Sequence, residues 1–228
     1  MDLNFYNEHG YYIEENVFND AECAALIAAS SKLENSQNQS FRPQMMPHRS
    51  EDIYLNALRN PRIVKSIEQA VGGEAVGLQT EYFYCKPGTR GFSNHQDNFF
   101  VEASTGVFAS AWCALTDTYA EKGGLIVYPG SHKEGLLPVQ KLSLGAAAGQ
   151  DPNANNEETI IPAKYKPVNA VVPKGAVLYI HGLLVHGSNP NATADKARDV
   201  LLCTYIKKGE QFRSGKYAQR APVELKVA

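Results

Sequence analysis

The stretch Ser93-Asn94-His95-Gln96-Asp97-Asn98-Phe99-Phe100 places a histidine and an aspartate two positions apart. In an extended segment, side chains at i and i+2 point to the same side of the backbone. His95 and Asp97 can therefore bind one metal ion, with a third ligand that is distant in sequence. The best third ligand is His186, in His186-Gly187-Ser188-Asn189-Pro190. Two histidines and one carboxylate form a facial triad, which leaves positions of an Fe(II) ion open for a co-substrate and oxygen.

The other histidines offer one alternative ligand set. Cupin-type proteins use three histidines, so His95, His181 and His186 form a rival set. That set would leave Asp97 idle beside the metal, and we therefore favour the triad with Asp97. We expect His181 to be a packed or supporting group and His132 to hold its Pro-Gly-Ser-His turn by a hydrogen bond.

Arg198 precedes the apolar run from Asp199 to Ile206, which reads as a buried strand. A buried guanidinium is costly unless it has an anionic partner. A small dicarboxylate would supply that partner, because the planar guanidinium binds a carboxylate through two parallel hydrogen bonds.

Several motifs, in this order, resemble the phytanoyl-CoA dioxygenase family of Fe(II)- and 2-oxoglutarate-dependent oxygenases. The resemblance covers roughly residues 5 to 207, and the ordered set is more specific than any one motif. The motifs are Gly10-Tyr11-Tyr12-Ile13, His95-Gln96-Asp97, Trp112-Cys113-Ala114-Leu115-Thr116-Asp117, Gly123-Gly124-Leu125-Ile126-Val127-Tyr128-Pro129-Gly130-Ser131-His132-Lys133, His186-Gly187-Ser188-Asn189-Pro190-Asn191 and Arg198.

The resemblance implies a role for each matching residue. Fe(II) would be held by the triad, and 2-oxoglutarate would chelate the iron through its keto acid end. The far carboxylate would pair with Arg198 and accept a hydrogen bond from the Ser188 hydroxyl. Trp112 would line the co-substrate pocket, with Gln79 on the preceding strand as a further contact. Related halogenases lack the carboxylate, so Asp97 favours hydroxylation of a small molecule by O2, with release of succinate and CO2.

The substrate side of the iron is less defined by the sequence. The aromatic candidates suit a partly apolar substrate, and the arginines suit an acid. The candidates are Asn98, Phe99, Tyr82, Tyr84, Arg90 and Arg49. The polar segment 34–50 is expected to be a loop that carries Arg42, His48 and Arg49; Arg49 or His48 would meet a substrate anion if this loop closes.

The hydrophobic pattern predicts a mainly β protein, a double-stranded β-helix (jelly roll, cupin-like) with flanking N-terminal helices. We expect one oxygenase domain over residues 1–228, with a helical part at about 15–73 and a jelly-roll core at about 76–207. Helices are predicted from Asn19-Asp20, from Asp52 to Arg59 and from Pro61 to Val71; strands are predicted at 11–13, 78–85, 107–115, 124–128, 176–180 and from 198. Residues 145–158 are expected to form a long surface loop.

Composition and net charge argue against several classes of function. A net charge of −2 argues against a basic surface for nucleic acid or anionic membranes. We expect no signal peptide and no membrane span, because no apolar run approaches the roughly 18 residues that a span needs. The cysteines Cys23, Cys85, Cys113 and Cys203 are scattered, which is typical of reduced thiols in a cytoplasmic protein.

Two other hypotheses remain open at this point. A cupin-like enzyme could bind iron or zinc without 2-oxoglutarate, in which case Arg198 would be dispensable for turnover. A non-catalytic ligand-binding jelly roll is the second alternative, and the complete triad argues against it. The sequence leaves the substrate, the stereochemistry and the oligomeric state undetermined.

Overall fold

The structure is a computed structural model that describes residues 1–37, 43–142 and 157–226. Helices precede the first long strand, and only short helical turns follow it. The helices are α1 (Leu3–His9), α2 (Asp20–Ser30), α3 (Glu34–Gln37), η1 (Pro47–Arg49), α4 (Asp52–Leu58), α5 (Pro61–Ala70), α6 (Asn98–Val101) and η2 (Ser131–Glu134).

The three predicted helices are confirmed, and two of them begin with a capping asparagine. Asn19 and Glu22 form a capping box that satisfies two backbone N–H groups at the start of α2. Asn60 caps α5, and Pro61 occupies its first turn, where the missing N–H has no cost. Helix α1 was not predicted. Two regions of the sequence analysis, Arg42 and residues 145–156, lie outside the described residues.

The strands pair in three antiparallel sheets. The major sheet has the order β1-β9-β4-β11-β3-β2, the minor sheet has the order β10-β5-β8, and β6 pairs with β7. The strands are β1 (Tyr11–Glu14), β2 (Gln44–Met45), β3 (Ala75–Cys85), β4 (Phe108–Ala114), β5 (Leu125–Val127), β6 (Val139–Lys141), β7 (Glu157–Thr159), β8 (Val168–Asn169), β9 (Val177–His181), β10 (His186–Ser188) and β11 (Arg198–Lys207).

Two structural details differ from the sequence predictions. The segment 34–50 is not a plain loop, because it contains α3, β2 and η1. The end of the predicted 145–158 loop is strand β7, which pairs with β6. All other predicted strands are present, with bounds shifted by one to three residues.

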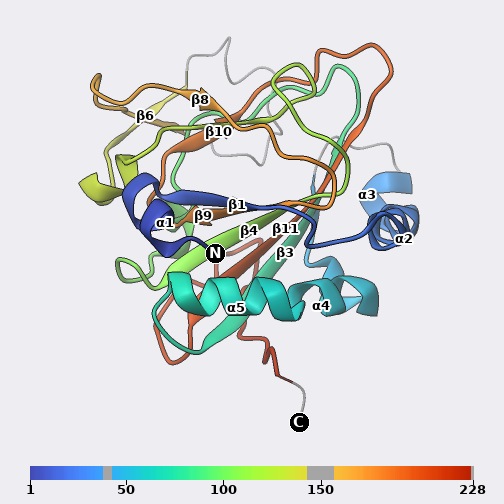
Figure 1. Cartoon of the computed structure of the whole chain (residues 1–228), viewed down its shortest axis with the longest axis horizontal. Helices are drawn as coiled ribbons and strands as arrows, with labels where there is room; N and C mark the ends of the chain where they lie inside the picture. The colour runs from blue at the N-terminus through green and yellow to red at the C-terminus, as the bar shows by residue number, and fades with distance from the viewer. Residues whose placement is uncertain (38–42, 143–156, 227–228) are drawn as a thin grey trace.

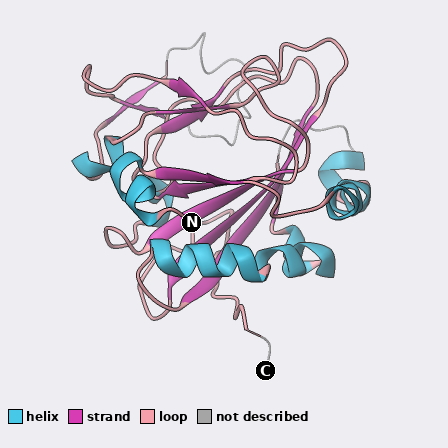
Figure 2. Cartoon of the chain, in the orientation of Figure 1, coloured by secondary structure: helices cyan, strands magenta, loops and turns pink. Residues whose placement is uncertain are grey.

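The layers match the predicted double-stranded β-helix (Figures 1 and 2). Helices α4 and α5 cover one face of the major sheet, and the minor sheet lies across its other face. The helix side is filled by an apolar core that includes Tyr54, Ile63, Ile67 and Tyr205, all nearly inaccessible to solvent. Because α4 and α5 seal this face, any cavity must open on the opposite, inner face of the sheet.

The register of β4, β11 and β3 arranges the inner face in cross-strand rows. Alternate residues along a strand point to the same face, so the members of each row share the inner face of the sheet. From one end, the rows are Ser110, Thr204 and Gln79; then Trp112, Leu202 and Glu81; then Ala114, Val200 and Phe83; and finally Arg198 and Cys85. The two end rows are about 20 Å apart along the strands.

Within the described residues, none of the helices combines the length and apolar character that crossing a membrane requires.

Candidate metal centre and its pocket

The structure brings His95, Asp97 and His186 together. His95 Nε2 lies 3.5 Å from Asp97 Oδ1, and His186 Nε2 lies 3.6 Å from the same oxygen. The two imidazole ring centroids are 4.4 Å apart. Two nitrogens and one carboxylate oxygen thus surround a space that suits metal–ligand distances of about 2.0–2.2 Å. Among the described residues, this is the one group of three or more such ligands.

Hydrogen bonds fix the tautomer of each imidazole. His95 Nδ1 lies 2.8 Å from the Ser93 carbonyl, and His186 Nδ1 lies 3.1 Å from the Leu184 carbonyl. A carbonyl can only accept, so each Nδ1 carries the proton and each Nε2 presents its lone pair. This is the arrangement in which metal-binding histidines are commonly oriented by their surroundings.

The segment that carries His95 and Asp97 is held by its backbone and by Gln96. His95 and His186 exchange two backbone hydrogen bonds, of 2.8 and 3.0 Å. Between the two ligands, Gln96 points away from the site and is 1% exposed. Its Nε2 donates to two carbonyls, and its Oε1 accepts from the Leu137 N–H. Gln96 therefore anchors the ligand segment on both sides.

Two local features of the backbone position the ligands. A Cβ on Gly187 would lie 2.7 Å from Asn94 Oδ1 and 2.9 Å from the Phe92 carbonyl, so only glycine permits the contact. We expected the whole segment to be extended. Instead, Asp97 has helical angles, with φ −56° and ψ −35°, and lies immediately before the single turn of α6. The turn still directs its carboxylate toward His95 and His186.

The three ligands are buried enough for their charges to interact strongly. Burial opposes ionisation of Asp97, but the two histidines and a hydrogen bond from Ser110 hold the pKa of this carboxyl well below its usual range. Burial lowers the pKa of His186 to about 4. Burial also opposes protonation of His95, yet the Asp97 carboxylate raises its pKa overall. A carboxylate beside a neutral imidazole is the form that binds a divalent cation.

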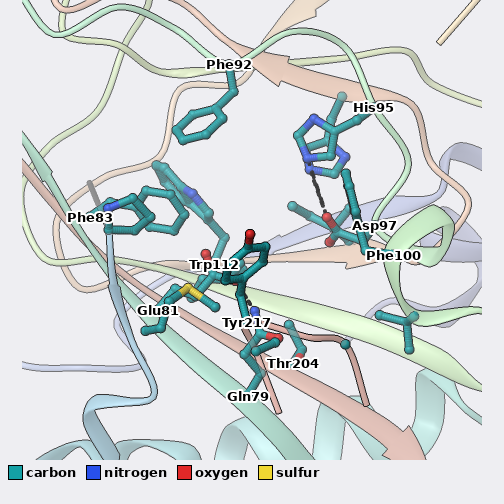
Figure 3. A pocket seen from close by; sticks show the side chains of 18 of the residues that line it. Gln79, Glu81, Phe83, Phe92, His95, Asp97, Phe100, Trp112, Thr204 and Tyr217 are labelled. Atoms are coloured by element: carbon teal, nitrogen blue, oxygen red, sulfur yellow. Dashed lines mark hydrogen bonds and ion pairs between the residues drawn. The ribbon is translucent and has the colours of Figure 1, made fainter. Parts of the chain in front are cut away.

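The triad opens into a cavity of about 740 Å³ on the inner face of the major sheet. Figure 3 shows Asp97 and His95 on one side of this cavity and Phe83 and Glu81 on the other. Six aromatic side chains contribute to its walls: Phe83, Phe92, Phe100, Phe108, Trp112 and Tyr217. Such a volume with largely apolar walls suits a small organic molecule.

Arg198 lies in the last row of the inner face and is 3% exposed. Its guanidinium donates to the Gly123 carbonyl and to Cys85 Sγ, and its Nε has no partner in the described part of the chain. Its central carbon lies 5.7 Å from the centre of the Trp112 ring. No carboxylate of the described residues forms an ion pair with it, so this buried cation lacks the anion that would stabilise it.

Ser188 and Trp112 line the cavity with Arg198, whereas Gln79 lies at the opposite end. Ser188 Oγ accepts a hydrogen bond of 2.9 Å from the Phe92 N–H, which leaves its own proton available to a ligand. Gln79 is three rows from Arg198, too far to share a carboxylate with it.

None of the six suggested substrate residues lines the cavity. Tyr82 and Tyr84 point to the helix side, where Tyr82 donates to Asp199 and Tyr84 to the Ser30 carbonyl. The Asn98 side chain is occupied by the backbone of Ala103. Three others lie outside the residues that line the cavity: Phe99, Arg90 and Arg49. Within α6, Phe100 takes the place expected for Phe99.

The remaining histidines have other partners. His181 Nδ1 accepts from the Leu183 N–H, and its ring packs 4.9 Å from that of His132. His132 Nε2 bonds to the Asn7 carbonyl and so ties η2 to α1. His48 Nδ1 lies 2.7 Å from Thr80 Oγ1. None of the three lines the cavity, so the geometry does not support the three-histidine set.

Glu81 and the C-terminal segment 212–223 also belong to the site, although neither was predicted. Glu81 faces the cavity, and burial, reinforced by the charge of Asp97, raises its pKa to about 7. The C-terminal segment follows β11, crosses the mouth of the cavity with Tyr217 and returns to β3, where Val223 and Gly77 exchange two hydrogen bonds. Arg49 donates to the Gln219 carbonyl and fixes this segment from the side of η1.

Comparison with known proteins gives a consistent result. The family model for phytanoyl-CoA dioxygenase (PhyH) matches residues 6–200. A Danio rerio protein named phytanoyl-CoA dioxygenase domain-containing protein 1 is 29% identical over 161 residues, covering 67% of this chain and 52% of the relative. An ectoine dioxygenase of Bordetella parapertussis is 24% identical over 220 residues, covering 82% and 68%. The chain spans about half the length of the first curated relatives.

Solved structures share the fold at low identity. The epimerase SnoN, in complex with Fe3+, alpha ketoglutarate and nogalamycin RO, superposes with a TM-score of 0.73 at 21% identity, covering 92% of this chain and 84% of SnoN. EvdO2 from Micromonospora carbonacea var. aurantiaca, complexed with 2-oxoglutarate, gives 0.71 at 16% identity, covering 97% and 91%. Because the family model spans most of the sequence and the motifs fall at the pocket, the chain belongs to the phytanoyl-CoA dioxygenase (PhyH) family.

Proposed function

We propose that the protein is an Fe(II)- and 2-oxoglutarate-dependent dioxygenase that hydroxylates a small molecule with release of succinate and CO2. One observation carries the proposal: the His95, Asp97 and His186 triad faces the same cavity as Arg198, a buried cation for which the described residues supply no carboxylate partner. Three protein ligands leave open positions for a keto acid and oxygen. When bound, the iron would supply the oxidative chemistry, which the protein side chains cannot perform.

The chain's own residues would orient the co-substrate. Arg198 would bind the far carboxylate of 2-oxoglutarate, supported by the Ser188 hydroxyl and by the face of Trp112. A dicarboxylate there would provide the anion that the guanidinium lacks. The aromatic walls would exclude water from the reacting C–H bond, which limits side reactions.

The substrate class and the setting are further parts of this proposal. Relatives named ectoine dioxygenase carry a small-molecule substrate in their names, and a cavity of about 740 Å³ is suited to a substrate of that size class. The four cysteines are free and buried, which supports a reducing, cytoplasmic setting. We also propose that the helical and β regions act as one oxygenase domain, because α4 and α5 pack directly on the major sheet.

The experiment is anaerobic addition of Fe(II) and 2-oxoglutarate to the metal-free protein, followed by visible absorption. A keto acid chelated to the iron should give a weak charge-transfer band. We expect the band in the wild type and in His9→Ala, a histidine change on α1 outside the cavity. We expect its loss in His95→Ala and in Asp97→Ala. On admission of oxygen, the wild type should convert 2-oxoglutarate to succinate.

Each other result has a defined meaning. Iron binding without the band would remove the role of Arg198 and favour a cupin-like enzyme that does not use 2-oxoglutarate. Absence of iron binding would contradict the enzyme proposal as a whole.

A further inference from the structure

At the end of the cavity away from Arg198, two buried oxygens have no hydrogen-bond partner among the residues that the structure describes. They are Gln79 Oε1 and Thr204 Oγ1, on side chains that are 3% and 4% exposed. An unpaired buried polar atom destabilises the folded protein, so such atoms are retained where something else pairs with them. Both residues line the cavity, so a bound molecule can reach them.

Glu81 completes a compact group with these two residues, which we call the acceptor cluster: Gln79, Glu81 and Thr204. Gln79 and Thr204 are direct partners across β3 and β11, and Glu81 lies two residues along β3 on the same face. Gln79 Nε2 donates to the Glu81 carboxylate, which turns its Oε1 toward other donors. Figure 3 shows the three side chains gathered below Trp112, across the cavity from Asp97.

Glu81 is not neutralised by an ion pair with any described residue. The cations that the C-terminal segment brings to the cavity have other partners. Arg213 pairs with Glu102 at 2.7 Å, and Lys216 lies over the Tyr217 ring. Arg220 donates through Nη1 to the carbonyls of Phe100 and Arg213, its Nε has no partner among the described residues, and it acts on Glu81 only through space. The cluster therefore presents a carboxylate and two further acceptor oxygens.

An acceptor-rich, negatively charged site recognises a donor-rich cation. A primary ammonium has three N–H donors and no acceptor, which matches the three side chains of the cluster. The neighbouring faces of Trp112 and Phe83 would add cation–π attraction. A carboxylate or phosphate would meet like charge at Glu81. We propose that the substrate carries a primary ammonium group and that the acceptor cluster binds it.

The position of the cluster fits a substrate that reaches the metal. Ser110, which hydrogen-bonds Asp97, occupies the same cross-strand row as Thr204 and Gln79. Gln79 is two strands from Ser110, or about 10 Å between backbones. An ammonium bound at the cluster would thus place a carbon a few bonds away beside the triad. Arg198, at the other end of the cavity, would remain free for the co-substrate.

This inference rests on the proposed function for its meaning, but its test needs neither iron nor 2-oxoglutarate. The metal-free protein at pH 8 is titrated by calorimetry with 2-phenylethylammonium and with its neutral match, 2-phenylethanol. We expect the ammonium to bind at least tenfold more tightly, because hydrogen bonds to a charged group are stronger than neutral ones. Glu81→Gln should reduce this preference to within about twofold while leaving the affinity for the alcohol unchanged.

Two controls separate the cluster from general charge and from misfolding. Glu121→Gln removes an exposed carboxylate that does not line the cavity and should keep the preference. Thr204→Ser retains the hydroxyl and Thr204→Val removes it, so only the valine variant should weaken ammonium binding. Equal affinities for the two probes, no measurable ammonium binding at 10 mM (roughly the weak limit of specific binding), or a preference that survives in Glu81→Gln would overturn the inference. The last result would assign the ammonium to Asp97. Failure of the absorption test above would instead count against the dioxygenase.

Discussion

Ser110 Oγ donates a hydrogen bond of 2.6 Å to Asp97 Oδ2, so Asp97 Oδ1 is the oxygen that faces His95 and His186. Ser110 lies on β4 in the middle of the major sheet and is fully buried. The hydroxyl thus connects a central strand of the major sheet to the carboxylate that would bind the metal.

Removing this hydroxyl should weaken metal binding without abolishing it. We expect Ser110→Ala to lower Co(II) or Fe(II) affinity by about tenfold, because groups that orient a ligand typically contribute 10- to 100-fold. Competition with a metal indicator under nitrogen measures the change. Ser104→Ala, an exposed serine between α6 and β4, is the matched control and should bind metal as the wild type does. An unchanged affinity in Ser110→Ala would mean that β4 does not position Asp97.

Arg198 should govern 2-oxoglutarate affinity and not iron affinity. Arg198→Lys keeps the charge but loses the two-pronged geometry, so we expect the KM for 2-oxoglutarate to rise at least about tenfold. Metal titration should give the wild-type affinity, because Arg198 does not touch the triad. Arg90→Gln, an exposed arginine outside the cavity, is the control. Wild-type KM in Arg198→Lys would contradict the assignment.

Tyr82 should contribute to stability and not to catalysis. Its hydroxyl donates to Asp199 Oδ1 at 3.0 Å on the helix side of the sheet. Tyr82→Phe would leave a buried carboxylate without this donor, so the free energy of unfolding should fall by about 1–3 kcal/mol. Urea unfolding measures the loss, and Tyr217→Phe, at a side chain 73% exposed, should change stability by less than about 0.5 kcal/mol. If Tyr82→Phe changed the KM for the substrate and left the free energy of unfolding unchanged, Tyr82 would again be a candidate substrate residue.

The acceptor cluster predicts a conflict between stability and ligand binding. Thr204 Oγ1 is buried without a partner among the described residues, so Thr204→Val should raise the free energy of unfolding by about 1 kcal/mol. Native proteins tolerate such a cost where a ligand repays it. Thermal and urea unfolding of the ligand-free protein test this directly, with Thr80→Val as the contrast. Thr80 Oγ1 is paired with His48, so its loss should destabilise.

His48 should make the protein sensitive to mild acid. Burial lowers the pKa of His48 to about 4, whereas the unfolded chain protonates near 6.5. Between these values the unfolded state binds more protons, so this stability is fully present above pH 6.5 and is lost as pH falls toward 4. We expect wild-type stability to fall by about 2 kcal/mol more than that of His48→Gln between pH 7.5 and pH 5.0. Parallel pH dependence in urea titrations of both proteins would contradict the assignment.

The residues that carry chemistry were largely accessible from the sequence, because they are rare polar types in apolar surroundings. His95, Asp97, His186 and Arg198 were named from spacing and from the cost of a buried cation, and the geometry brings them to one cavity. The strands were predicted for a similar reason, since turns rich in glycine and proline separate β-branched and aromatic runs.

The face of β3 could not be predicted in the same way. Both faces of this central strand are buried, so alternation does not reveal whether Glu81 and Phe83 or Tyr82 and Tyr84 line the cavity. Which face lines the cavity depends on how β3 pairs with β11. The two strands are distant in sequence: Tyr82 and Asp199, which are in contact, are 117 residues apart. The substrate residues taken from that strand were therefore those on the wrong face.

The anchoring role of Gln96 and the path of the C-terminal segment were also hidden. Gln96 is identified by its three hydrogen bonds to the distant residues Gly135, Leu137 and Leu183, which no local pattern encodes. Residues 212–223 have neither helical nor strand periodicity. In the structure they are held by isolated contacts, such as those of Gly77 and Arg49, and such contacts produce no repeating pattern in the sequence.

The route of this C-terminal segment has a consequence for divergence within the family. The wall that would meet the substrate includes Tyr217 and Arg220, which follow the last strand, while the triad belongs to segments joined earlier in the chain. Insertions or exchanges between Arg213 and Val223 alter the mouth of the cavity without moving a ligand, because both ends of the segment are fastened to backbone at Val101 and Gly77. Selection can thus change the compound that is accepted while the three residues that would hold the metal stay in place.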